Sequence, residues 1–61
     1  MVCWRVYRPS RVGKYRVGGK RCIHINSVFY DDDCDKEYVR RSLIGHDGYP
    51  ADIIVVKEKR S

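Results

Sequence analysis

The first thirty residues of this chain contain no aspartate or glutamate. Seven arginines and lysines lie in this stretch, so residues 1–30 carry a formal charge of +7. Residues 31–61 hold all eight acids against six bases, which leaves a net charge of +5 for the whole chain. Because a wholly basic half produces a positive potential, it attracts phosphate groups or an acidic protein surface. The absence of acidic residues therefore points to a binding partner. It does not point to an enzymatic reaction.

Long apolar runs are also missing. Arg5 and Arg8 interrupt the apolar residues near the N-terminus, which argues against a signal peptide. No segment approaches the roughly 18–20 apolar residues of a membrane span, so we expect no membrane partner. Only three cysteines occur, whereas a small secreted domain usually carries an even, paired set. We therefore predict a cytoplasmic, intracellular protein with reduced cysteines.

The short chain limits the size of the core. Its 61 residues allow one domain, spanning residues 1–61. A domain this small buries only about 60% of the surface that its unfolded chain exposes. A homodimer or a bound partner would add to its stability. The composition is nevertheless that of a folded protein, because 43% of the residues are hydrophobic and seven are aromatic.

Alternating apolar and polar residues predict three strands in the basic half. Val2–Tyr7 alternates with a period of two, and Pro9 ends this strand because proline cannot donate to a sheet. A second strand covers Tyr15–Val17. The pair Gly18-Gly19 then predicts a tight turn, since both positions accept positive φ angles. The third and longest strand is predicted over Lys20–Tyr30.

The second half predicts one helix and one strand. The aspartates of residues 31–35 provide a cap for a helix over Lys36–Ile44, because an Asp side chain accepts hydrogen bonds from the first helical turn. Gly45 or Gly48 ends the helix. Ala51–Lys59 is rich in Ile and Val and predicts the last strand. We therefore predict an α+β domain of order β-β-β-α-β, in which a three- or four-stranded sheet carries one helix on one face.

One helix leaves the second face of this sheet open, or covered by another molecule. If Trp4 and Val6 face the helix together with Ile23 and Ile25, polar and basic side chains occupy the open face. That predicted set is Arg5, Tyr7, Arg16, His24 and Asn26.

The candidate binding residues are the bases of the first half and one tyrosine. They are Arg5, Tyr7, Arg8, Arg11, Lys14, Arg16, Lys20 and Arg21. Basic groups bind phosphates, and Tyr7 could stack on a nucleic-acid base. The alternative is that these charges only keep a small β-rich protein soluble and protect its sheet edges. On the helix, Arg40 and Arg41 are candidates for a protein contact, because arginine is enriched at protein interfaces.

Motifs for metal binding or catalysis are not found. A calcium loop starting at Asp31 would need Gly and Glu where the chain has Lys36 and Ser42. The cysteines lack the close pairs of a structural zinc site, and no serine lies in a nucleophile motif. We therefore predict a protein that is not an enzyme and has no metal or other cofactor. A metal-dependent nuclease that uses the aspartates is a third, weaker hypothesis.

Residues 33–50, with the sequence DCDKEYVRRSLIGHDGYP, resemble segments of small uncharacterised bacteriophage-encoded proteins. The resemblance implies an accessory protein that binds a host or phage macromolecule. Our first hypothesis is a binding module whose basic N-terminal sheet surface contacts nucleic-acid phosphates. The alternative is a regulator or inhibitor that docks on an acidic surface of a larger host protein. In that case Val2–Tyr7 or Ala51–Lys59 would add a strand to the host protein's sheet.

Overall fold

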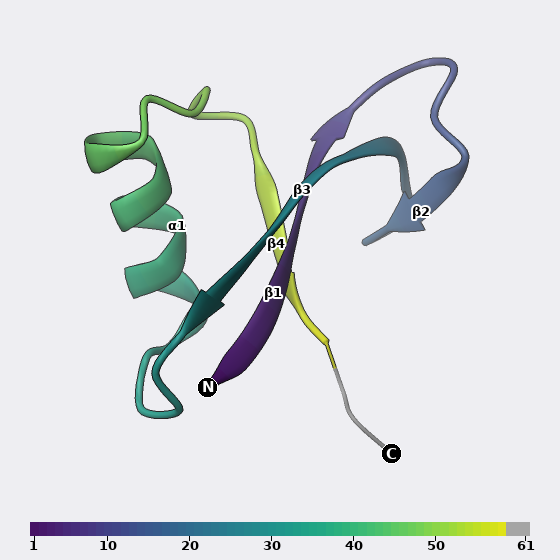
Figure 1. Ribbon diagram of the computed structural model, residues 1–61. Helices are drawn as coiled ribbons and strands as arrows, with labels where there is room; N and C mark the ends of the chain where they lie inside the picture. The colour runs from purple at the N-terminus through teal and green to yellow at the C-terminus, as the bar shows by residue number, and fades with distance from the viewer. Residues whose placement is uncertain (59–61) are drawn as a thin grey trace.

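Residues 1–58, which the computed structural model describes, form a four-stranded antiparallel sheet with one helix on it (Figure 1). The elements are β1 (Val2–Pro9), β2 (Tyr15–Val17), β3 (Lys20–Tyr30), α1 (Lys36–His46) and β4 (Ile54–Lys57). This confirms the predicted α+β class and the order β-β-β-α-β. No helix among these residues is long and apolar enough to cross a membrane.

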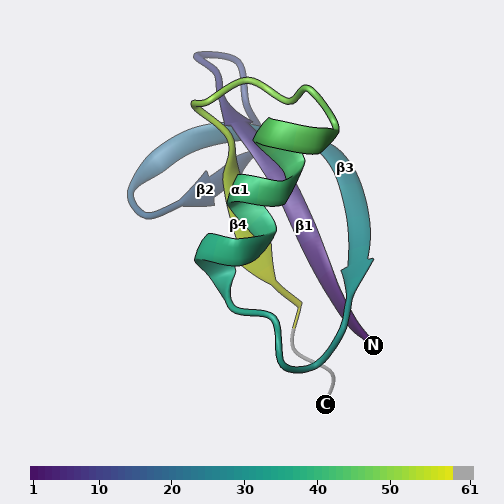
Figure 2. The ribbon, with the colours of Figure 1, turned by 90° about the vertical axis from the view of Figure 1, so that its left-hand side faces the viewer.

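The strand order is β2-β3-β1-β4, which places the first strand in the interior of the sheet. β1 pairs antiparallel with both β3 and β4. Consequently β3 and β4 run parallel on either side of β1, and α1 connects them across one face (Figure 2). The hypothesis that Val2–Tyr7 adds a strand to a host protein is therefore wrong, because both of its edges are already paired.

β4 lies at the edge of the sheet, but it is shorter than predicted. The turn after Pro50 occupies the first predicted positions, and the backbone N–H of Ile53 donates to the carbonyl of Pro50 at 3.3 Å. The strand therefore begins at Ile54 instead of Ala51. The predicted end of the strand, Lys59, lies outside the described residues.

Local signals in the sequence determine the turns and the ends of the helix. Gly18 and Gly19 have φ angles of 59° and 80°, as the tight turn requires. The carboxylate of Asp35 accepts a hydrogen bond of 2.8 Å from the Tyr38 N–H and caps α1. Gly48, with φ of 73°, follows the helix, so it rather than Gly45 ends α1.

The core lies between α1 and one face of the sheet. Its buried side chains are Trp4, Val6, Val39, Leu43, Ile53 and Val55. Trp4 and Val6 face the helix as predicted. Ile23 and Ile25 were predicted to join them, but they are 38% and 37% exposed and lie outside the core.

A bulge in β3 explains the position of Ile25. Ile23 pairs with Arg8, two residues after Val6, so it keeps the helix side of the sheet but lies beyond the core. Val6 pairs with Asn26 and Tyr7 pairs with His24, so Ile25 has no partner on β1. The extra residue reverses the alternation of β3, and Asn26 lies on the helix face. There its amide donates to the Tyr49 hydroxyl at 2.6 Å. The prediction that Asn26 occupies the open face is therefore wrong.

Two glycines give a matched pair of stability predictions. A Cβ on Gly13 would lie 2.1 Å from the carbonyl oxygen of Cys22, whereas a Cβ on Gly45 would meet nothing. We expect Gly13→Ala to lower the free energy of unfolding by about 1–3 kcal/mol through overpacking. Gly45→Ala, inside α1, should raise it by about 1 kcal/mol. Urea denaturation followed by circular dichroism measures both; an unchanged stability for Gly13→Ala would contradict the packing of the loop before β2.

Candidate functional site

Ion pairing divides the bases of the first half into two groups. Arg5 Nη2 lies 2.5 Å from Glu58 Oε1, and Arg8 Nε lies 3.4 Å from Asp52 Oδ1. Both acids come from the C-terminal segment, because β4 lies beside β1. The other five bases form no ion pair with any residue from 1 to 58. They are the exposed side chains of Arg11, Lys14, Arg16, Lys20 and Arg21.

The five unpaired bases lie in residues 10–21, which we call the basic hairpin. The segment runs from the end of β1 through β2 to the start of β3, and it projects from the sheet far from α1 (Figure 1). It is tied to the sheet by a hydrogen bond of 2.9 Å from the Ser10 N–H to the Arg21 carbonyl. Gly13 contributes by packing directly against the backbone of Cys22. The hairpin therefore presents its charges from a defined backbone.

Two arginines of the basic hairpin face each other across the strands. Arg16 on β2 is the direct partner of Arg21 on β3. Tyr15 and Cys22, their neighbours, lie on the face away from α1, so both arginines lie on the other side of these strands. The prediction that Arg16 occupies the open face is therefore wrong. Like charges at directly opposed positions destabilise a sheet, whereas opposite charges there stabilise it. This pair therefore has a cost in stability that no acid of residues 1–58 offsets by an ion pair.

A shallow hollow lies beside this pair. It is lined by Pro9, Ser10, Arg11, Lys20 and Arg21. The backbone carbonyl of Arg11 accepts a hydrogen bond of 3.5 Å from Arg21 Nη1, which brings the two arginines together. Three cationic side chains around an open hollow suit an anionic oxygen-rich group, because guanidinium groups bind phosphate through two parallel hydrogen bonds.

Tyr7, the predicted stacking residue, is buried. It is only 5% exposed, and its ring centroid lies 5.4 Å from that of Tyr15 and 5.3 Å from that of His24. The nearby Tyr7 hydroxyl raises the pKa of the Arg5 guanidinium, and Glu58 raises it further. The exposed ring of this cluster is instead Tyr15, at 46%. Sequence reasoning missed Tyr15, although its strand position and its place among the bases were visible signals.

The two helix arginines bind within the chain. Arg40 Nε donates to the Ile53 carbonyl at 3.4 Å, and Arg40 Nη2 donates to the Ala51 carbonyl. Arg40 therefore fixes the connection from α1 to β4. Arg41 pairs with Glu37 one turn earlier at 3.0 Å, where both side chains are well exposed. Of the two predicted contact residues, only Arg41 is therefore presented to a partner.

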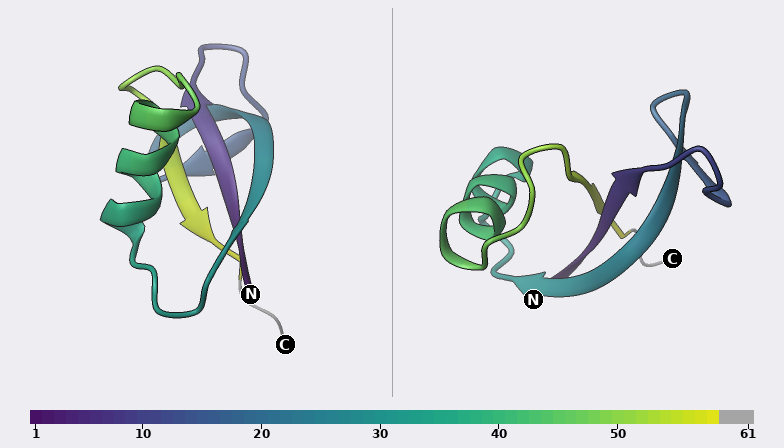
Figure 3. Two further views of the ribbon diagram at one scale, coloured as in Figure 1. Left: turned by 60° about the vertical axis from the view of Figure 1, so that its left-hand side comes forward. Right: turned by 90° about the horizontal axis from the view of Figure 1, so that it is seen from above.

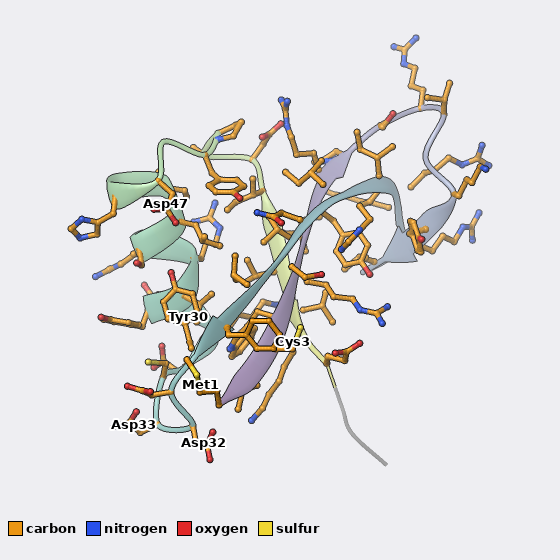
Figure 4. The ribbon with its side chains drawn as sticks, in the orientation of Figure 1. Met1, Cys3, Tyr30, Asp32, Asp33 and Asp47 are labelled. Carbon is orange, nitrogen blue, oxygen red and sulfur yellow. The ribbon has the colours of Figure 1, made fainter. Side chains whose placement is uncertain are left out.

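The aspartate-rich segment has structural roles. Asp35 caps α1, and the Asp31 carbonyl accepts a hydrogen bond of 3.1 Å from the Cys34 N–H. Asp32 and Asp33 extend outward from the tip of the loop (Figure 4). Partial burial raises the pKa of the Cys34 thiol, and the negative charges of Asp33 and Asp31 raise it further. Within residues 1–58, no three His, Cys, Asp or Glu side chains are grouped to hold a metal ion.

No protein-family model, curated protein or solved structure matches this chain. The resemblance of residues 33–50 to bacteriophage-encoded proteins therefore stays a prediction.

Proposed function

We propose that this protein is a non-enzymatic binding module whose basic hairpin contacts nucleic-acid phosphates, as in a small accessory protein of the bacteriophage type. The observation that carries the proposal is the opposed pair Arg16 and Arg21 within a segment that has no acid. Because this arrangement lowers the stability of the sheet, folding does not account for it. A polyanionic ligand would neutralise both charges and remove the repulsion.

The distribution of acids supports the same conclusion. A surface that serves only solubility carries both signs of charge interspersed. Here Glu58 and Asp52 pair with Arg5 and Arg8 on β1, so the fold does bring acids to the basic half. Neither of these two acids forms an ion pair with any of the five bases of the hairpin. Their combined positive potential is therefore available to a partner.

The proposal predicts strongly salt-dependent binding. Each phosphate contact on duplex DNA contributes about −0.9 to the slope of log affinity against log salt. Contacts from all five bases would give a slope of about −4.5, or a loss of affinity of about 500-fold between 50 and 200 mM salt. Fluorescence anisotropy with labelled single- and double-stranded DNA and RNA measures this slope.

Absence of binding to all four nucleic acids at the lowest salt would contradict the proposal. The acid-free hairpin would then be better explained by an acidic protein surface. Co-purification of one stoichiometric protein that survives nuclease treatment would identify that alternative.

A further inference from the structure

We infer that the ligand is a single-stranded nucleic acid that lies across the sheet face opposite α1, with its bases stacked on Tyr15 and Phe29. This inference rests on the proposed function and specifies its substrate class. No helix of the described residues covers this face, because α1 lies on the other side (Figure 3). Tyr7 on this face is buried beside the rings of Tyr15 and His24. The occupant follows from the side chains that this face presents.

Strand alternation places both aromatic rings on the same face. Trp4 faces the helix, so its neighbour Cys3 lies on the opposite face, and Phe29 is the direct partner of Cys3. Tyr15 belongs to this face because its ring packs against Tyr7 and His24. One ring therefore lies at the basic hairpin and the other near the far end of β3.

Both rings are open to a ligand. Phe29 is 57% exposed, although an apolar ring is normally buried, and Tyr15 is 46% exposed. The contacts of Tyr15 with Tyr7 and His24 hold its ring in place, with centroid distances of 5.4 and 6.2 Å. A ring that is already fixed loses little entropy when a base stacks on it.

The separation of the rings suits an extended strand of nucleic acid. Tyr15 is the partner of Cys22, and Phe29 lies seven residues further along β3, one of which is the bulge. At about 3.3 Å per residue, the rings are roughly 20 Å apart. One strand several nucleotides long can therefore reach both.

Charge and base accessibility favour a single strand over a duplex. Of the unpaired bases on β2 and β3, Lys20 lies on this face, diagonally across from Tyr15, and its charge can contact the ligand's backbone. Arg16 and Arg21 lie on the other side of the same two strands, at the edge of the sheet. Arg5 lies further along this face, where its positive charge is offset by the ion pair with Glu58. Within a duplex the bases stack on each other, so their faces are not available to protein rings. Unpaired bases stack on aromatic side chains with little dependence on sequence.

Anisotropy measurements on Tyr15→Ala and Phe29→Ala test this inference, with an oligothymidylate and a duplex of equal length as probes. We expect the wild-type protein to prefer the single strand. Each variant should lose about 5- to 150-fold in affinity for it, the range measured for one base–aromatic stack. The salt slope should stay unchanged, because stacking releases no counterions. Tyr15→Phe keeps the ring and should retain binding.

Tyr38→Ala is the matched control, because Tyr38 is also 57% exposed but lies on α1 beside Asp31 and Asp35. Its affinity should equal that of the wild-type protein. Salt-dependent binding that is unaffected by Tyr15→Ala and Phe29→Ala, or that is tighter to the duplex, would overturn the inference and leave the proposed function intact. No binding of either probe by the wild-type protein would overturn both. Circular dichroism confirms that each variant is folded.

Discussion

We expect the combination of Lys14→Glu and Arg16→Glu to weaken nucleic-acid binding by about 100-fold or more. Charge-assisted hydrogen bonds contribute roughly 1.5–3 kcal/mol each, and two of them are lost. The slope of log affinity against log salt should fall in magnitude by about 2, because two phosphate contacts disappear. Anisotropy titrations at several salt concentrations measure both quantities.

The same variant should remain at least as stable as the wild-type protein. Arg16→Glu replaces a like-charge pair with an acid opposite Arg21, which adds about 0.2–1 kcal/mol to sheet stability. Both substituted side chains are exposed. Stability and binding are therefore expected to change in opposite directions, which is typical of residues retained for function and not for folding.

Lys36→Glu combined with Arg41→Glu is the matched control. These residues lie on α1, and their reversal changes the net charge by the same amount. Only the long-range attraction should weaken, and physiological salt screens most of that effect. Equal losses of affinity in the two double variants would show that binding follows net charge and not the basic hairpin.

Leu43→Ala should produce the largest loss of stability. Leu43 is completely buried against the sheet, and truncating such a leucine costs about 2.7–5 kcal/mol. A domain of this size has a total stability of about 3–9 kcal/mol. We expect the melting temperature to fall by about 11–40 °C, or the domain to unfold. Thermal melting followed by circular dichroism measures the change.

Ile44→Ala removes a neighbouring side chain that is only partly buried at the margin of the core. Its loss should be clearly smaller, because less apolar surface returns to water. Equal destabilisation by the two substitutions would contradict the orientation of α1 on the sheet.

The elements of this fold were predictable because their signals are local. Gly18-Gly19 specifies the turn before β3, and the Asp35 cap and Gly48 specify the ends of α1. Each signal acts within a few residues of the structure that it determines. The start of β3 at Lys20 and the start of α1 at Lys36 follow directly from them, and the alternation of apolar and polar residues predicts the strands.

The non-local features could not be predicted in the same way. The bulge at Ile25 depends on the pairing of β3 with β1, and the bond from Asn26 to Tyr49 joins residues 23 positions apart. Likewise, Arg5 and Arg8 form ion pairs with Glu58 and Asp52 only because β4 lies next to β1. The candidate site was thus predicted as a basic set, but the fold selects which of its members remain unpaired.

The most direct test of the central claim is a titration of ¹⁵N-labelled protein with a short oligonucleotide at low salt, followed by amide chemical shifts. We predict that the largest shifts fall in the basic hairpin, residues 10–21, and that α1 and the aspartate-rich segment change little. Shifts concentrated on α1, or none at saturating oligonucleotide, would contradict the account.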